Sequence, residues 1–288
     1  MKRIAVVTDS TANLPVDLLE KYEIDVIPMN VHWGSETYQD GVTIDAETFY
    51  RWLKERDDYP QTSQPSAGEF MDFFRQVAAR HATDTIVGIF VSAELSGTLT
   101  SAYLAQQALP ELKLEIVDSR SFSMGLGFQV MAATQAVLDG FPLETVVQRV
   151  HDVRDRTQVI AAVETLEYLH RGGRIGGAAR LLGTMLNLKP VLHIQNGRVE
   201  PLDKVRSRRK SLDRVIAIAE ERLAGARPAA LAVIHTGELE EVDLMLNLAS
   251  ERLKPERLYT SIFPPVVGTH SGPGTVGIAY YTKNGLDW

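Results

Sequence analysis

The chain of 288 residues contains no cysteine. Disulfides, thiolate nucleophiles and cysteine-ligated metal sites are therefore excluded, and the composition fits a reducing compartment, so we expect a cytoplasmic location. The chain also lacks any apolar run of about 18 residues, the length that a membrane-spanning helix needs. The sequence thus predicts neither an integral membrane segment nor a targeting segment.

Several motifs of familiar enzymes are missing as well. The chain has no G-x-x-x-x-G-K-[ST] phosphate loop, no H-E-x-x-H zinc motif and no G-x-S-x-G nucleophile elbow. The pair Gly125-Leu-Gly127 lacks the third glycine of a dinucleotide site. None of the seven histidines is paired with another at the spacing of metal ligands on one helix. We therefore expect no metal site and no cofactor.

The net charge of −7 is unevenly distributed along the chain. Residues 1–160 contain 13 Lys and Arg against 23 Asp and Glu, whereas residues 161–288 contain 17 against 14. Between Arg171 and Arg214 the chain carries 11 basic and three acidic residues, which predicts a positive face for an anionic ligand or an acidic partner. Nucleic acid is not the expected partner, because this segment lacks interleaved aromatics and a known binding pattern. A merely solvated charged surface is the alternative.

Short β-branched runs alternate with helical patterns in the first part of the chain, which is typical of a parallel α/β sheet with right-handed crossovers. The sequence predicts strands at Ile4–Val7, Asp25–Val31, Thr85–Val91 and Leu112–Val117, and helices at Ala46–Arg56, Glu69–Arg80, Thr98–Ala108 and Leu126–Leu138. We assign residues 1–160 to this N-terminal α/β domain. Ligands are expected at the carboxyl ends of its strands, where the hydroxyl-rich loops 8–11, 92–98 and 118–124 lie.

Residues 161–288 are predicted to form a C-terminal α+β domain. Asn196-Gly197 between two apolar runs is a strong hairpin signal, so this domain should contain antiparallel pairing that the first lacks. Further strands are predicted at Val159–Val163, Ala230–Ile234, Ser261–Val267 and Thr275–Tyr281, and helices at Leu212–Leu223 and Leu239–Leu253. We expect the ligand cleft between the two domains.

The segment Thr62-Ser-Gln-Pro-Ser-Ala-Gly-Glu-Phe70 combines hydroxyls with a helix start. Ser66 and Glu69 have the spacing of a capping box, and an amphipathic helical pattern follows. Thr62 and Ser63 then lie just ahead of a helix N-terminus, where a carboxylate or phosphate is favoured. The alternative is a helix cap with no ligand.

Two other loops have similar character. Ser96 lies between an apolar strand and a helix, and His270 lies among glycines that allow close approach of a ligand. Ser96 would otherwise be a helix cap, and His270 a histidine satisfied within a tight turn.

Six short motifs, in order from residue 8 to residue 274, together resemble those of the DegV family. They are Thr8-Asp-Ser-Thr11, Thr62-Ser-Gln-Pro-Ser66, Leu95-Ser-Gly-Thr98, Val117-Asp-Ser119, Arg171-Gly-Gly-Arg-Ile175 and Gly268-Thr-His-Ser-Gly-Pro-Gly274. The resemblance implies two domains that bury one long-chain fatty acid between them. It also implies that an ATP-dependent partner, the kinase subunit of a bacterial fatty acid kinase, phosphorylates the carboxyl group. The binding protein itself would then be no enzyme.

The resemblance also implies roles for particular residues. In that family the carboxylate is held by the threonine of T-S-Q-P and the serine of L-S-G-T, which match Thr62 and Ser96, and His270 matches the headgroup histidine. We add the neighbouring Ser63 to this carboxylate site. The arginines of R-G-G-R, Arg171 and Arg174, match the region of the carboxyl end and of kinase docking.

We infer that the basic stretch through Arg206 and Arg208 extends that docking surface. Candidates for lining the lipid tail are Met124, Leu126, Phe128 and the segment 181–188, although apolar residues are more often ordinary core.

Two other functions stay open. One is a hydrolase or transferase in which Ser96 or Thr62 is the nucleophile and His270 the base, which requires these side chains within hydrogen-bond reach. The other is a regulatory protein that docks an acidic partner through its basic second part.

Overall fold

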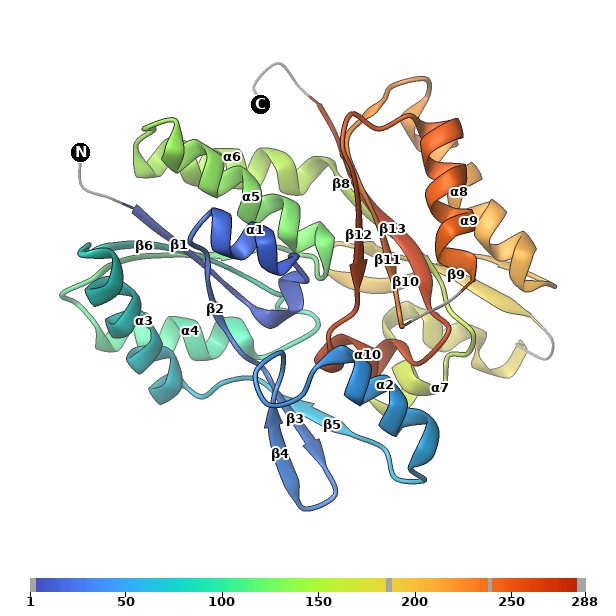
Figure 1. The fold of residues 1–288 in the computed structure, drawn as a ribbon, viewed down its shortest axis with the longest axis horizontal. Helices are drawn as coiled ribbons and strands as arrows, with labels where there is room; N and C mark the ends of the chain where they lie inside the picture. The colour runs from blue at the N-terminus through green and yellow to red at the C-terminus, as the bar shows by residue number, and fades with distance from the viewer. Residues whose placement is uncertain (1–3, 185–187, 238–239, 284–288) are drawn as a thin grey trace.

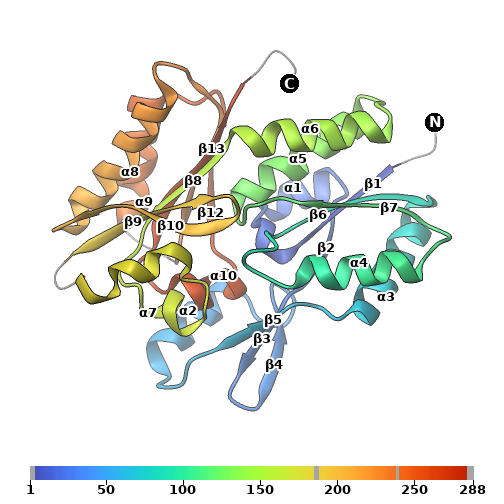
Figure 2. The ribbon, with the colours of Figure 1, turned by 180° about the vertical axis from the view of Figure 1, so that it is seen from behind.

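The computed structural model describes residues 4–184, 188–237 and 240–283. Its first part is built on a parallel sheet of four strands in the order β2-β1-β6-β7 (Figure 1, and Figure 2 for β7). These strands are β1 (Ile4–Asp9), β2 (Asp25–Ile27), β6 (Thr85–Phe90) and β7 (Lys113–Asp118). Every pair is parallel, which confirms the predicted N-terminal α/β architecture.

Helices cover both faces of this sheet because its strands are buried on both sides. On β1, Ala5 and Val7 pack in one core cluster while Val6, between them, packs in another. Helices α3 (Ala67–His81) and α4 (Thr98–Ala108) cover the face of Val7, and α5 (Met124–Leu138) covers the opposite face. The remaining helices of this part are η1 (Ser10–Ala12), α1 (Val16–Lys21), α2 (Ala46–Glu55) and α6 (Leu143–Arg156).

One prediction for the first part is wrong, because this part also contains antiparallel pairing. The expected strand Asp25–Val31 is broken at Pro28, whose missing N–H cannot continue a ladder. Beyond it the chain forms an antiparallel sheet of three strands in the order β4-β3-β5. These are β3 (Asn30–Trp33), β4 (Glu36–Gln39) and β5 (Gln61–Ser63).

The second part is built on a six-stranded sheet in the order β10-β9-β8-β13-β11-β12. All its pairs are antiparallel except β11 with β12, as the α+β prediction implies. The hairpin at Asn196-Gly197 is confirmed, and both residues have positive φ, 50° and 81°. The strands are β8 (Thr157–Ala162), β9 (Lys189–Gln195), β10 (Arg198–Val205), β11 (Pro228–His235), β12 (Leu258–Ile262) and β13 (Val276–Thr282).

The predicted strand Ser261–Val267 is wrong in its second half. The chain leaves β12 at Ile262, and Pro264-Pro265 then begins the helix α10 (Pro265–Ser271). Proline suits the first turn of a helix because its fixed φ is helical and its missing N–H would be unpaired there. His270 therefore lies on a helix rather than in a glycine loop. The other helices are α7 (Glu167–Arg171), η2 (Gly176–Thr184), α8 (Arg208–Leu223), α9 (Glu241–Leu248) and η3 (Ala249–Leu253).

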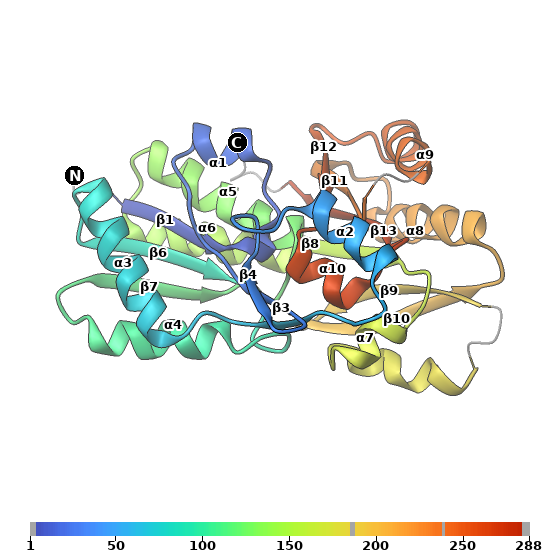
Figure 3. The same cartoon turned by 60° about the horizontal axis from the view of Figure 1, so that its bottom comes forward.

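Helix α5 lies between the two large sheets, and α8 and α9 cover the far face of the second one (Figures 1 and 2). One core cluster consequently joins residues of both sheets, such as Val87 of β6, Phe128 of α5 and Ala279 of β13. Seen from below, α2 and α10 lie at the junction of the two parts (Figure 3). The predicted boundary at residue 160 falls inside β8, and the division into two domains stays a prediction.

Across residues 4–184, 188–237 and 240–283, no helix has the length and apolar character needed to cross a membrane.

Candidate functional site

A pocket with an empty volume of about 580 Å³ lies where the two parts of the chain meet. In the first part, residues of η1, β5 and the loops after β2, β6 and β7 line it. In the second part, residues of α7, α10 and β10 and Arg174 line it. Its polar lining residues are Thr11, Thr62, Ser96, Arg174, His270 and Ser271. Its apolar lining residues are Met29, Val91, Leu95, Phe122, Leu169, Val199, Val266 and Val267. The pocket is thus largely apolar, with polar groups converging on it.

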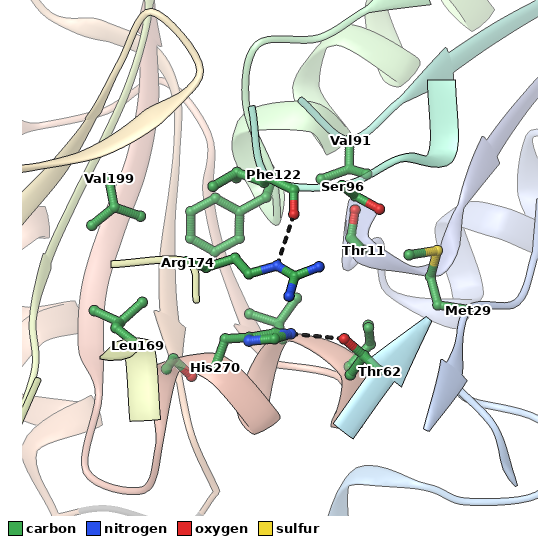
Figure 4. A pocket seen from close by; sticks show the side chains of 14 residues that line it. Thr11, Met29, Thr62, Val91, Ser96, Phe122, Leu169, Arg174, Val199 and His270 are labelled. Carbon is green, nitrogen blue, oxygen red and sulfur yellow. Dashed lines mark hydrogen bonds between the residues drawn. The ribbon is translucent and has the colours of Figure 1, made fainter. Parts of the chain in front are cut away.

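The central polar contact joins Thr62 to His270. Thr62 lies on β5, His270 lies on α10, and the Thr62 Oγ1 atom is 2.8 Å from His270 Nε2 (Figure 4). The ring of His270 is held against Gly172, because a Cβ atom at Gly172 would lie 2.1 Å from His270 Nδ1. The R-G-G-R motif therefore provides space for the histidine through its first glycine.

His270 is uncharged in this environment. Burial, foremost, and the positive charge of Arg174 together lower its pKa to about 4. The Nδ1 atom is buried and has no hydrogen-bond partner among the described residues. The pocket therefore holds a neutral imidazole beside a permanent cation.

Arg174 supplies that cation and connects the two parts of the molecule. Its Nε donates to the Leu95 carbonyl oxygen at 3.0 Å, and its NH1 donates to the Gly172 carbonyl oxygen at 2.7 Å. Figure 4 shows its guanidinium extending between Phe122 and His270 into the space that Thr62 and Ser96 border. These backbone bonds orient the guanidinium but leave its charge without a carboxylate among the described residues.

Ser96 and Thr11 complete the polar side from the first part of the chain. Ser96 Oγ lies 2.8 Å from Thr98 Oγ1 and accepts the Thr98 N–H at 3.3 Å, so it shapes the start of α4 and also borders the pocket. Thr11 donates its hydroxyl to Asp9 Oδ1 at 2.5 Å. The loops after three of the parallel strands gather at one place, since Thr11, Ser96 and Phe122 all line this pocket.

A second cavity of about 400 Å³ empty volume adjoins the first. It shares Phe122, Leu169, Val199 and Ser271 with the first pocket and extends along the six-stranded sheet. The other residues that line it are Val159, Ala161, Val163, Leu192, His193, Ile194, Phe263 and Thr275. We call these two adjoining cavities the channel; polar side chains converge on the first cavity, and the second is lined mainly by apolar residues.

Four residues of the predicted site lie outside this pocket. Ser63 alternates with Thr62 on β5 and bonds His32 Nε2 at 2.8 Å. Arg171 pairs with Glu167, and its guanidinium carbon lies 3.8 Å from the centre of the Tyr59 ring. Arg206 is exposed in the turn before α8.

Arg208, at the start of α8, pairs with Glu241 at 3.2 Å and donates to the carbonyl oxygen of Ala162 at 3.4 Å. None of these four is brought to the cluster of Thr62, Ser96, Arg174 and His270.

The proposed tail-lining residues lie elsewhere too. Met124, Leu126 and Phe128 are fully buried in the core because α5 packs between the sheets, and none lines either cavity. In the segment 181–188, Leu181 packs near Ala178, and residues 185–187 lie outside the described structure.

The apolar lining residues Phe122, Leu169 and Val199 are absent from the sequence predictions. Only Phe122 had a local signal, since it lies in the loop after a parallel strand.

The described residues include no group of three or more His, Asp or Glu side chains placed to hold a metal ion. The polar groups that line the pocket are hydroxyls, one imidazole and one guanidinium. Such groups suit a carboxylate, since charge-assisted hydrogen bonds from arginine and hydroxyls to carboxylates are strong.

Comparisons with known proteins point to one family. A family model described as "Uncharacterised protein, DegV family" matches residues 3–283. Protein DegV of Bacillus subtilis is 31% identical over 281 residues, which are 97% of this chain and 99% of that protein.

Two solved structures resemble the fold closely. One is of a DegV family protein from Thermus thermophilus described by its fatty acid binding, with a TM-score of 0.89, 34% identity, and coverage of 98% of this chain and 100% of that one. The other is of DegV, a fatty acid binding protein from Bacillus subtilis, with a TM-score of 0.89, 30% identity and the same coverage.

Proposed function

Because this chain belongs to the DegV family, we propose that it binds one long-chain fatty acid in the channel between its two sheets. The carboxylate would lie among Thr62, Ser96, Arg174 and His270, and the tail would extend into the apolar cavity. The observation that carries this proposal is the polarity of the channel, which has one cluster of polar groups and one apolar arm. The relatives from Thermus thermophilus and Bacillus subtilis that bind fatty acids support it.

The energetics are consistent with such a ligand. Each buried methylene contributes roughly 0.8 kcal/mol, so a long tail supplies most of the affinity. A buried carboxylate is costly unless it is paired, and here Arg174 supplies the opposite charge while the hydroxyls supply donors. A bound carboxylate would also raise the pKa of the adjacent His270 from its low value, since a nearby negative charge favours the imidazolium.

We propose further that the protein presents this carboxylate to an ATP-dependent kinase subunit, which forms the acyl phosphate. The family resemblance and the charge of the second part support this step. Arg171 and Arg206 are solvent-exposed at least in part, Arg171 lies close to the pocket beside Gly172, and these arginines would attract an acidic surface of the kinase. The protein itself would then carry no catalytic group.

Mass spectrometry tests the ligand directly. The purified protein is sprayed under native conditions and then extracted with organic solvent, and we expect one fatty acid per chain. In a titration of the delipidated protein, Thr62→Val should lower fatty acid affinity about fivefold, because it removes one hydrogen bond from the carboxylate. Ser63→Ala, which alters the neighbouring hydroxyl outside the pocket, is the matched control. A protein whose mass no added fatty acid shifts would refute the proposal.

A second candidate function rests on the 2.8 Å separation of Thr62 Oγ1 and His270 Nε2, which meets the geometric need of a hydrolase or transferase. Thr62 would attack an ester carbonyl carbon and pass its proton to His270, which would protonate the leaving alcohol. The low pKa of His270 makes it a weak base, and its Nδ1 has no orienting carboxylate among the described residues. Release of nitrophenol from a nitrophenyl ester that disappears in Thr62→Val would favour this function.

A further inference from the structure

The six-stranded sheet is split at one place. Strands β8 and β9 pair only where Ile160–Ala162 faces Val191–His193. Because β8 begins at Thr157 and β9 ends at Gln195, the segments 157–159 and 194–195 face each other without pairing. A cavity of about 930 Å³ empty volume lies at this split and is lined by both segments.

This cavity is basic. Three arginines from three separate elements line it: Arg120 from the loop after β7, Arg154 from α6 and Arg222 from α8. The only carboxylate among its lining residues is Asp155, which pairs with Arg154 at 3.1 Å. Asp118 lies beside it and accepts the backbone N–H of Arg120 at 2.8 Å. The lining therefore keeps an excess of positive charge, which favours an anion.

Two of these arginines have no ion-pair partner among the described residues. Arg222 is oriented by neutral acceptors, the side-chain oxygen of Gln158 and His193 Nδ1, the latter 3.2 Å away. Burial and the charge of Arg222 lower the pKa of His193 to about 4, so this imidazole stays neutral. Arg120 is exposed to solvent. Both guanidinium groups are therefore available to a ligand.

The basic cavity also adjoins the apolar one. Val159, His193 and Ile194 line both, just as Phe122 and Ser271 line both the apolar cavity and the pocket of Thr62 and His270. The three cavities thus adjoin in sequence, because the basic cavity shares lining residues with the apolar one and none with the pocket of Arg174. Cationic side chains therefore lie on both sides of the apolar cavity. A ligand that fits this sequence of environments has an acidic group at each end of an alkyl chain.

We propose that the basic cavity binds the far carboxylate of a long-chain α,ω-dicarboxylic acid whose first carboxylate lies at Arg174 and Thr62. This inference rests on the proposed function, because it places the same kind of ligand in the same channel. A monocarboxylic acid leaves the charges of Arg120 and Arg222 to water. A dicarboxylic acid long enough to reach the basic cavity replaces that water by charge-assisted hydrogen bonds from the arginines to its far carboxylate.

Affinity as a function of chain length tests this proposal. Delipidated protein is titrated with saturated dicarboxylic acids from dodecanedioic to eicosanedioic acid and with the matching monocarboxylic acids. We expect dicarboxylic affinity to peak at one length, because two anion sites at a fixed separation select one span. Arg222→Gln should lower the affinity at that peak about tenfold and leave palmitate affinity within about twofold.

Two further variants make the result decisive. Arg120→Gln, at an exposed side chain, tests the cavity without disturbing the bonds that Arg222 makes to β8 and β9. Arg227→Gln, at an arginine that donates to the carbonyl oxygen of Lys254 outside the cavity, is the control.

The proposal is overturned if monocarboxylic acids bind more tightly at every length, or if both cavity variants leave dicarboxylic affinity unchanged. It is also overturned if inorganic phosphate binds palmitate-loaded protein through Arg222 while dicarboxylic acids show no length optimum. Palmitate binding in the same series reports separately on the proposed function.

Discussion

The two parts of the chain contribute different chemistry to the pocket between them. The first part, residues 4–160, supplies hydroxyls, because Thr62 lies on β5, Thr11 lies in η1 directly after β1, and Ser96 lies in the loop after β6. The second part supplies nitrogen groups, Arg174 and His270, from the segment after α7 and from α10. A carboxylate needs both donors and a positive charge, so the complete site exists only where the two parts are held together.

Two buried acidic residues of the first part bond the backbone, whereas an arginine of the second part lines the pocket. Asp9 accepts the Val91 N–H at 2.8 Å, and Asp40 accepts the Val266 N–H at 3.1 Å, so both carboxyls are buried behind the pocket wall. The arginine of the second part instead reaches the pocket itself. The two charges therefore have different roles here. The carboxyls of Asp9 and Asp40 hold the backbone in place, whereas the guanidinium of Arg174 is available to a ligand.

Asp40 gives the largest expected effect, because it connects the first part to the first turn of α10. Burial, foremost, and the nearby Asp9 raise its pKa to about 7, far above the unfolded value of 3.8. The folded protein therefore holds this proton where the unfolded chain has lost it, and stability falls as pH rises from about 4 to about 7. We expect Asp40→Asn, which keeps an acceptor for Val266, to raise the free energy of unfolding at pH 8 by about 2 kcal/mol.

Urea unfolding of both proteins at pH 5 and pH 8 measures this effect, and the gain should be much smaller at pH 5. Asp45→Asn is the control, because the N–H of Thr48, foremost, lowers the pKa of Asp45 and this carboxyl stays charged at both pH values. An Asp40→Asn effect of equal size at both pH values would show that the carboxyl is not protonated in the folded protein.

The two arginines of the R-G-G-R motif test which residue of the second part supplies the positive charge. Arg174 lines the pocket, whereas Arg171 lies over Tyr59 and pairs with Glu167 outside it. We expect Arg174→Gln to weaken fatty acid binding about thirtyfold, as for loss of a charged hydrogen bond. Arg171→Gln should change the affinity less than twofold. Equal losses in the two variants, measured by calorimetric titration, would contradict this assignment.

Gly172 is expected to have the next largest effect, because it makes room for the imidazole. A Cβ atom there would lie 2.1 Å from His270 Nδ1, so Gly172→Ala must displace the ring from Thr62. We expect about a tenfold loss of fatty acid affinity and a loss of stability of about 1–3 kcal/mol, typical of overpacking.

Gly68→Ala is the matched control, since a Cβ atom there meets only ordinary contact and the residue lies exposed in α3. It should leave affinity unchanged and stabilise the helix slightly. Retained affinity in Gly172→Ala would show that the position of the ring does not matter for binding.

The sequence predicted most of what local rules determine. The parallel strands, the capping box at Ser66 and the hairpin at Asn196-Gly197 follow from patterns within a few residues. The small antiparallel sheet and α10 were missed because Pro28 and Pro264-Pro265 interrupt apolar runs that otherwise resemble single strands. In both cases the proline geometry outweighs the β-branched composition.

The site was only partly predictable, for a different reason. Thr62 and His270 are 208 residues apart, and no periodicity indicates that they meet. The family resemblance grouped them with Ser96, but it could not separate Arg174 from Arg171, because it named both arginines of one motif. Ser63 was our own addition to Thr62, and it lies outside the pocket because adjacent residues of a strand face opposite ways. Apolar lining residues such as Phe122 and Val199 are indistinguishable in sequence from core residues, since both kinds are hydrophobic residues of similar size.

The smallest expected effect concerns Ser66. Its substitution distinguishes a helix cap from an anion site at the start of α3. Ser66 Oγ accepts the Glu69 N–H at 3.2 Å, and Glu69 accepts the Ser66 N–H at 2.7 Å, so the capping box is complete. Ser66→Ala should lower the free energy of unfolding by about 1 kcal/mol, and Ser66→Gly by only a few tenths. Both variants should bind fatty acid as the parent protein does, because Ser66 is absent from the pocket lining. A loss of affinity in Ser66→Ala that exceeds its loss of stability would instead place part of the ligand at this helix start, and would extend the hydroxyl side of the site beyond Thr62.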